Sequence, residues 1–134
     1  MADEALIVVD AGCLFDVVTS SGATAAIRER IDADKDQASP HVVDVEVLGV
    51  IRREFQNGGL DATAAGRAVE LLGEWPGERF GHQPLLPRAW ELRDNVRGWD
   101  AMYVALAELL DATLVTKDRR LASAAGPRCP IEVF

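Results

Sequence analysis

The pattern of apolar and polar residues begins with a run of five apolar positions, Ala5–Val9, that ends at Asp10. Three of the five are β-branched, which is typical of a strand that is buried on both faces of a sheet. A second run of this kind, Thr113–Thr116, is followed two residues later by Asp118. The pattern therefore predicts two buried strands, each of which ends beside an aspartate.

Helical spacing of apolar residues occupies most of the chain between these strands. Apolar residues at positions 43, 47, 50, 51 and 55, followed by the stop signal NGG, predict a helix over Val43–Asn57. Asp61 can cap a helix that continues to about Trp75. The segment after Gly98 is apolar around nearly its whole circumference, which indicates a buried helix. We also expect helices at Ala11–Thr19, Ala23–Ala33, Pro84–Asn95 and Arg119–Ala125, short strands at Glu78–Phe80 and Ile131–Phe134, and a solvated loop at DADKDQASP, residues 32–40.

This order of elements predicts an α/β fold in which helices cover a small and mostly parallel central sheet. A chain of 134 residues can bury a substantial core. Its composition, 49% hydrophobic and 27% charged, is that of a globular protein and not of a disordered one. Because no repeat, linker or low-complexity tract interrupts the pattern, we expect residues 1–134 to form a single domain.

Charge and cysteine content exclude several classes of protein. The formal net charge of −8 argues against strong non-specific attraction to nucleic acid, so any activity on nucleic acid must depend on local charge or metal ions. Cys13 and Cys129 are isolated and form no disulfide framework, which fits a reducing cytoplasm. No segment approaches the roughly 20 apolar residues that cross a bilayer. We therefore expect a cytoplasmic protein without membrane association.

Four acidic residues are candidates for one shared site. In open parallel sheets, ligands bind beyond the carboxyl ends of the strands, where Asp10 and Asp118 are expected to lie. Glu46 flanks the apolar stripe of its helix and Asp100 opens the buried helix, and an acid near a core requires a partner. Clustered carboxylates repel one another and need compensating cations, and hard oxygen ligands suit Mg²⁺ or Mn²⁺. Thiolate and imidazole sites are set aside because the four possible ligands share no common spacing: Cys13, Cys129, His41 and His82.

Each acid also has an ordinary structural explanation. Asp100 and Asp118 can act as a first-turn acid or a helix cap, and Asp10 can form a turn. Glu54 also falls on the apolar side of the Glu46 helix, so facing alone does not select Glu46. The functional interpretation depends on the combination of two strand-terminal acids with two acids on helices.

Four motifs together resemble the PIN domain, and more narrowly the VapC-type toxins of bacterial toxin-antitoxin pairs. In chain order they are IVVDAG (7–12), DVEVLGVIRR (44–53), WDAMYVALAE (99–108) and LVTKDRRLA (114–122). The resemblance implies a three-layer α/β/α fold and carries the family's acidic quartet onto Asp10, Glu46, Asp100 and Asp118, with Thr116 in support. Two positions depart from the family pattern: Gly12, which is often polar, and Trp99, which is often Tyr.

The same resemblance implies an activity and partners. It implies an endoribonuclease that depends on Mg²⁺, or on Mn²⁺ in its place. Such an enzyme hydrolyses RNA phosphodiester bonds and inhibits growth or translation. A cognate VapB-type antitoxin and a homodimer are further expectations from the family. Basic residues near the motifs are candidate contacts to the RNA backbone: Arg53, Arg97, Lys117, Arg119 and Arg120. Trp99 could stack a base, but an aromatic residue beside a buried helix more often packs in the core, so we leave it outside the catalytic set.

Two alternatives to the nuclease remain to be compared with it. The first is a catalytically silent PIN-like binding module, whose acids hold a metal or a peptide without cleaving anything. The second is a phosphoryl-transfer domain, either a receiver or a phosphatase. The phosphatase signature requires a second Asp where Gly12 stands, and no predicted strand between Gly12 and Thr113 is followed by the Asp that a receiver needs.

Overall fold

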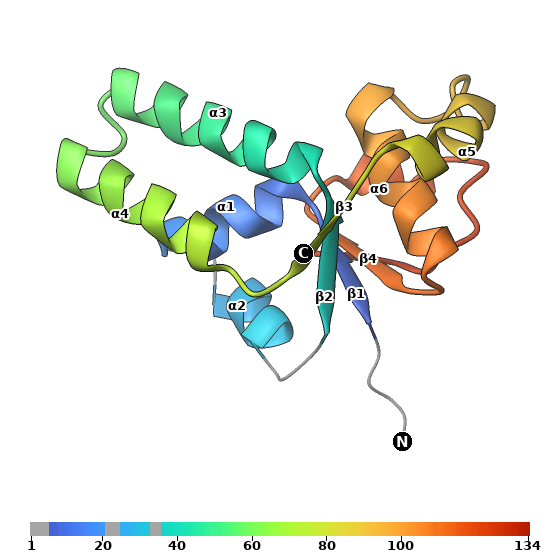
Figure 1. Cartoon of the computed structure of the whole chain (residues 1–134), viewed down its shortest axis with the longest axis horizontal. Coiled ribbons are helices and arrows are strands. Elements are labelled where there is room, and N and C mark those ends of the chain that lie inside the picture. Colours follow the sequence, from blue (N-terminus) through green and yellow to red (C-terminus); the bar gives the residue numbers. More distant parts are fainter. Residues whose placement is uncertain (1–5, 21–24, 33–35) are drawn as a thin grey trace.

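The computed structural model describes residues 6–20, 25–32 and 36–134 of the chain (Figure 1). The strands are β1 (Ile7–Val9), β2 (Gln37–Pro40), β3 (Glu78–Phe80), β4 (Thr113–Thr116) and β5 (Ile131–Val133). The helices are α1 (Ala11–Thr19), α2 (Ala25–Asp32), α3 (Val42–Gln56), α4 (Ala62–Glu74), the 3₁₀ turn η2 (Gln83–Leu85), α5 (Leu86–Glu91), α6 (Gly98–Leu109) and α7 (Arg119–Ser123).

The described strands form one five-stranded sheet in the order β3-β2-β1-β4-β5, and every neighbouring pair is parallel. The sheet was expected to be mostly parallel, and it is parallel throughout. β1 lies in the centre, and all three of its side chains are fully buried. Val9 of β1 is in register with Val115 of β4, so the carboxyl ends of these two strands lie at the same level.

Helices cover both faces of the sheet, which confirms the three-layer α/β/α fold (Figure 1). On one face α1, α3 and α4 pack against one another. On the other face α6 packs against β1, β2 and β4, and α5 packs against α6. The described helices include none that is both long and apolar enough to cross a lipid bilayer.

Local sequence signals account for the ends of the two long helices α3 and α4. Val43, Val47 and Ile51 recur every four residues and form the buried side of α3. Gly58, which follows the last turn, has a φ of +85°, a conformation that favours glycine. The carboxylate of Asp61 then caps α4 by accepting a hydrogen bond from the amide of Ala64 at 2.8 Å.

The expected loop at residues 32–40 was wrong in its second half, which forms β2. This strand pairs with β1 on one side and β3 on the other, and Ser39 is fully buried. The hydroxyl of Ser39 donates a hydrogen bond to the carbonyl of Val9 at 2.5 Å. Polar residues form this strand because neighbouring strands satisfy their hydrogen bonds, which no local pattern reveals. His41 follows the strand, so the receiver-type strand-then-Asp unit is still missing there.

The expected continuous helix over Pro84–Asn95 was also wrong. The segment instead forms η2 and α5, and the helix ends at Glu91. Leu92 and Val96 continue the apolar spacing and are buried, but they lie in successive turns in which the amide of Val96 donates to the carbonyl of Leu92. Turns can bury apolar residues at helical spacing, so periodicity overestimated the helix.

Other predicted elements are found with small changes at their ends. The first strand begins at Ile7, and its predicted first residue, Ala5, lies outside the described residues. The second helix is described over Ala25–Asp32, and positions 23, 24 and 33 of the prediction also lie outside.

Candidate active site

The candidate site lies at the topological switch point of the sheet. From β1 the chain order proceeds through β2 to β3 on one side, whereas β4 and β5 lie on the other side. In open parallel sheets, the crevice at the carboxyl ends of the strands that flank this reversal is the usual ligand site. Asp10 directly follows β1, and Thr116 is the last residue of β4, so these residues meet at that crevice.

Asp10 is fixed by hydrogen bonds from both sides of the crevice. Its Oδ1 accepts from the amide of Cys13, so that it caps α1, and its Oδ2 accepts from the hydroxyl of Thr116 at 2.5 Å. Burial raises the pKa of Asp10 above its ordinary value, although the hydrogen bonds and the positive charge of Lys117 oppose that rise. The ordinary role as a cap and a role in the site therefore coexist in one side chain.

Asp118 is connected to Asp10 through Thr116. Its backbone amide donates to the Thr116 hydroxyl at 3.0 Å, while its carboxylate caps α7 by accepting from the amide of Arg120 at 2.9 Å. Thr116 is completely buried, so the hydroxyl that connects the two aspartates is itself shielded from solvent. The sequence predicted that the Thr116 hydroxyl supports Asp118. In the structure this hydroxyl contacts both the backbone of Asp118 and the carboxylate of Asp10.

Asp100 comes from the first turn of α6 and faces the same crevice. Burial is the main cause of its raised pKa, and the negative charges of Asp118 and Asp10 raise it further. The carboxylates of Asp10, Asp100 and Asp118 therefore lie close enough to repel one another.

Glu46 extends from α3 toward the same group of charges. Burial, followed by the charges of Asp100 and Asp10, raises its pKa, while a hydrogen bond from Tyr103 lowers it. The Tyr103 hydroxyl donates to Glu46 Oε1 at 2.6 Å. Glu54, the alternative on the same helix, lies eight residues further along, or about 12 Å at the usual helical rise. The structure thus brings all four predicted acids together and separates Glu46 from Glu54.

The donor set fits a divalent cation such as Mg²⁺ or Mn²⁺. Carboxylate and hydroxyl oxygens are the hard ligands that these ions prefer. Within the described residues, no three His, Cys, Asp or Glu side chains are arranged to hold a metal ion by themselves. Mg²⁺ usually binds one or two carboxylates and keeps several of its waters, so interacting carboxylates without a closed cage suit it.

The basic residues singled out from the sequence have different surroundings. Arg97 lines a hollow of about 220 Å³ together with Asp100 and Asp118, and its charge acts on Asp100. Lys117 donates to Asp16 at 2.7 Å and also acts on Asp10. Arg53 and Arg119 are exposed, and among the described residues neither is hydrogen-bonded or ion-paired to the acids.

Sequence reasoning missed two residues of this neighbourhood, Tyr103 and Asp16, whereas Arg120 was already a candidate contact to the RNA backbone. Tyr103 follows Asp100 by three residues on α6, a spacing that places both on one helical face and could have signalled the contact. Asp16 is an acid buried inside α1 and paired with Lys117, and an acid within an apolar helix is itself a signal of a buried partner. Arg120 lines the same hollow as Arg97 and also acts on Asp100.

Comparison with known proteins identifies the family. The PIN domain model matches residues 7–127. The chain is 36% identical over 127 residues to Ribonuclease VapC1 of Mycobacterium tuberculosis, which covers 94% of this chain and 96% of the relative. It is 37% identical over 128 residues to Ribonuclease VapC9 of the same organism, with 96% and 98% covered. The chain is a PIN-domain protein of the VapC ribonuclease family.

A solved structure of the VapC family shows the same fold. The crystal structure of VapBC2 from Rickettsia felis, bound to a DNA fragment from its promoter, matches with a TM-score of 0.70 at 12% identity. The match covers 96% of this chain and 98% of the other. The family-model match and the identity to the VapC relatives confirm the PIN family that the four motifs suggested.

Gly12, where PIN toxins often carry a polar residue, leaves room for one. A Cβ added at Gly12 would lie 3.7 Å from both Asp10 Oδ1 and Lys117 Cε, which is ordinary van der Waals contact. The glycine is therefore not required by packing, and its absence of a side chain leaves the four acids in place.

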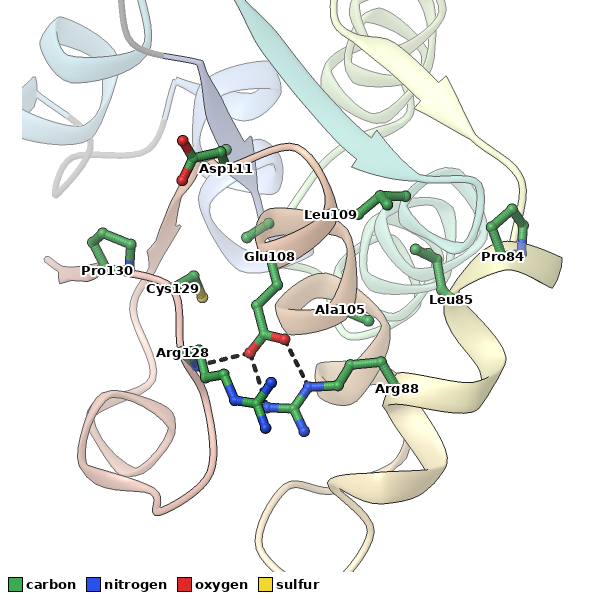
Figure 2. A pocket seen from close by; sticks show the side chains of 12 residues that line it. Pro84, Leu85, Arg88, Ala105, Glu108, Leu109, Asp111, Arg128, Cys129 and Pro130 are labelled. Carbon is green, nitrogen blue, oxygen red and sulfur yellow. Dashed lines mark hydrogen bonds and ion pairs between the residues drawn. The ribbon is translucent and has the colours of Figure 1, made fainter.

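A second cavity of this PIN domain, about 420 Å³, lies at the other end of α6 (Figure 2). Glu108 points into it and accepts hydrogen bonds from the Arg88 guanidinium at 2.7 and 3.1 Å and from the backbone amide of Arg128 at 2.7 Å. Glu108 follows Asp100 by eight residues, about 12 Å along the helix. The charges of Glu108 and Arg88 in this cavity already pair with each other. We therefore assign the cavity a structural role, in which it joins α5, α6 and the segment before β5.

Proposed function

We propose that this protein is an Mg²⁺-dependent endoribonuclease that acts as the toxin of a toxin-antitoxin pair, with Mn²⁺ as a possible substitute. The observation that carries the proposal is the meeting of four carboxylates from distant parts of the chain at the switch point of the sheet. The VapC ribonuclease names of its relatives support the choice of RNA as substrate.

In this proposal the metal is held by Asp10, Glu46, Asp100 and Asp118, either directly or through the waters that it keeps. When bound, Mg²⁺ supplies Lewis-acid chemistry, which activates water as a nucleophile and stabilises negative charge at the phosphate. Thr116 orients Asp10 through its hydroxyl, and Tyr103 orients Glu46 in the same way. Without a cation, the four acids would repel the phosphate of an RNA substrate.

Positive side chains around the acids bind the RNA backbone in this proposal. Arg97 and Arg120 line the hollow that contains Asp100 and Asp118. Lys117 is held near Asp10 by its ion pair with Asp16, so it provides charge at a fixed place. Local charge of this kind is necessary because the formal net charge of the chain is −8.

We also propose that the protein binds a VapB-type antitoxin and that it forms a homodimer. The similarity to a VapBC2 structure supports the antitoxin. Apolar side chains left exposed on α3, among them Val45, Leu48 and Phe55, offer area for a protein contact. Co-purification with the product of a neighbouring gene tests the first part, and light scattering of the isolated chain tests the second.

Cleavage of RNA tests the enzymatic proposal. Purified protein incubated with total cellular RNA should cleave it with Mg²⁺ or Mn²⁺ and should lose this activity in EDTA. Asp10→Asn and Asp118→Asn should each reduce the rate by at least about a hundredfold, because each removes a negative ligand while an Asn still caps its helix. Asp61→Asn is the matched control, since it changes the exposed cap of α4 in the same way.

The same assay separates the nuclease from the silent binding module. If no cellular RNA is cleaved with either metal by a folded protein, the binding module is the better description. If Asp61→Asn lowers the rate as much as Asp10→Asn, the effect belongs to helix capping and the proposed site is wrong.

A further inference from the structure

Trp99 is exposed at the rim of the candidate active site, although its neighbourhood favoured a place in the core. Its surface is 64% accessible, and it directly precedes Asp100 in the first turn of α6. With Arg97, Gly98 and Asp100 it lines a hollow of about 380 Å³. A large aromatic side chain in this position adds little to packing and presents an apolar surface beside the acids.

This hollow adjoins the one that contains two of the four acids. The second hollow, of about 220 Å³, is lined by Arg97, Asp100, Asp118 and Arg120 among others. The two hollows share Arg97 and Asp100, so a bound chain could pass from one to the other across Asp100. The positive charges of Arg97 and Arg120 oppose the increase in the pKa of Asp100 that burial causes.

The backbone beside Trp99 also leaves the hollow open. Gly98 has a φ of +24°, and apart from its chain neighbours and the backbone of its own helix, no atom of the described residues lies within 4 Å of the place where a Cβ would be. A residue with a side chain would be strained there and would fill part of the hollow. An open hollow with an aromatic wall and guanidinium groups at its edge matches the way single-stranded RNA is bound, by stacking of bases and contacts to phosphates.

A second exposed tryptophan shows what distinguishes Trp99. Trp90 on α5 is 67% accessible, but the guanidinium of Arg93 lies over its ring at 4.4 Å from the centroid. Among the described residues, Trp99 has no such cation or ring partner. Trp90 and Trp99 therefore have similar exposure, but Trp99 adjoins an acid of the site and, among the described residues, its ring has no cation or ring partner.

We propose that Trp99 is a stacking platform for a nucleobase of single-stranded RNA next to the scissile phosphate, with Arg97 and Arg120 binding the adjoining backbone phosphates. This inference rests on the proposed ribonuclease function and names the subsite that holds the substrate. A protein partner is the competing occupant. The two arginines favour RNA, because they place positive charge for binding phosphates beside the apolar ring.

Binding of a short oligouridine to Asp10→Asn protein, in which cleavage is suppressed, tests the subsite. We expect Trp99→Ala to weaken binding by roughly 5- to 150-fold, which is the range for loss of one base stacked on an aromatic residue. Trp99→Phe should retain most of the affinity. Trp90→Ala is the matched control and should change the affinity by less than about twofold, and thermal melting of each variant checks its fold.

Abasic probes make the test specific to stacking. Oligouridines that carry one abasic ribose, at each position in turn, should show one position where the missing base weakens binding to the Trp99-containing protein. The same probe should bind the Trp99→Ala protein no worse than the intact oligomer does. In protein with Asp10 intact, Trp99→Ala should raise KM much more than it lowers kcat, because stacking contributes to ground-state binding.

Other results would overturn the inference. Equal binding by Trp99→Ala and its parent, or an equal loss in Trp90→Ala, would show that Trp99 has no special role in RNA binding. A change in molecular mass on light scattering with unchanged RNA affinity would assign Trp99 to a protein interface. If the unmodified protein cleaves RNA and Trp99→Ala has the same KM, the proposed subsite is wrong but the proposed function stands. If the unmodified protein neither binds nor cleaves RNA, the proposed function itself is wrong.

Discussion

Thr116 donates a hydrogen bond to Asp10 at 2.5 Å, although 106 residues separate the two in the chain. The same hydroxyl accepts from the backbone amide of Asp118. A buried hydroxyl that both donates and accepts fixes the relative positions of two acids that the sheet brings to one edge. Adjacent pairing of β1 and β4, with Val9 opposite Val115, is what makes this contact possible.

Thr116→Val should therefore affect both stability and activity. Valine keeps the shape and the strand preference of threonine but leaves the amide of Asp118 without its acceptor and Oδ2 of Asp10 without its donor. We expect a loss of about 1–3 kcal/mol in the free energy of unfolding, measured in urea, together with slower RNA cleavage. Thr116→Ser, which keeps the hydroxyl, should recover most of both, and unchanged stability in the valine variant would contradict this role.

Neutralising one acid of the cluster should stabilise the metal-free protein at neutral pH. Burial raises the pKa of Asp100 and Glu46 in the folded state, so folding favours their protonated forms and loses stability as pH rises through those raised values. Asp100→Asn or Glu46→Gln should increase the free energy of unfolding by about 0.5–1 kcal/mol at pH 7, since partial exposure screens the repulsion.

The pH and metal dependence of that gain provides its check. The difference from the unmodified protein should vanish in acid, where the natural carboxyl is also neutral, and should grow as pH rises. Mg²⁺ should raise the melting temperature of the unmodified protein more than that of either variant, because a ligand stabilises the state that binds it. A variant that is less stable than its parent at pH 7 without metal would show that repulsion does not dominate.

Tyr103→Phe should weaken metal binding through Glu46. The Tyr103 hydroxyl is buried and holds Glu46 Oε1 at 2.6 Å. Partners that orient metal ligands typically contribute about 10- to 100-fold in affinity or activity. We expect Mn²⁺ affinity, measured by calorimetry, to fall by about tenfold in Tyr103→Phe. When Tyr103→Phe is added to Glu46→Ala, the affinity should fall by less than this. Equal losses in the two backgrounds would mean that Tyr103 acts without Glu46.

Glu108→Gln should destabilise the end of α6 that lies away from the site. Burial alone would raise the pKa of Glu108, but hydrogen bonds from Arg88 and the amide of Arg128 outweigh it and lower the pKa below its ordinary value. The carboxylate thus contributes stability that is present above the unfolded-state pKa and is lost as pH falls through the folded-state pKa. We expect Glu108→Gln to lose about 1–3 kcal/mol at pH 7 and progressively less relative to its parent below about pH 4.5.

An exposed ion pair gives the matched control for this change. Arg67 and Glu70 are one turn apart on α4, and more than half of each side chain is accessible. Glu70→Gln should change the free energy of unfolding by less than about 0.5 kcal/mol, because solvent screens such pairs. If urea unfolding shows similar effects for Glu70→Gln and Glu108→Gln, the buried pair has no special contribution.

Local patterns in the sequence predicted those elements whose energetics are local. The β-branched run of β1, the four-residue spacing of Val43, Val47 and Ile51 in α3, and the cap at Asp61 each depend on neighbours within a few positions. The acids at the ends of β1 and β4 could be proposed for the same site because parallel strands bring their carboxyl ends to one edge.

Only the tertiary structure revealed the elements and contacts that depend on distant partners. β2 is polar and contains Pro40, so it is a strand only because β1 and β3 pair with it. The apolar spacing of Leu92 and Val96 predicted helix, but packing buries both residues in turns. Trp99 was left outside the catalytic set because an aromatic residue beside a buried helix more often packs in the core, whereas the structure leaves it exposed.

By itself, the sequence determined the α/β class, the strand-terminal acids and the family resemblance, because these follow from short-range preferences and from motifs read in order. The tertiary structure decided which acids interact, through the pairing of β1 with β4 and the contact of Tyr103 with Glu46. The physical reason is that backbone preferences act over a few residues, whereas hydrogen bonds and charge interactions depend on distances in space that folding alone sets.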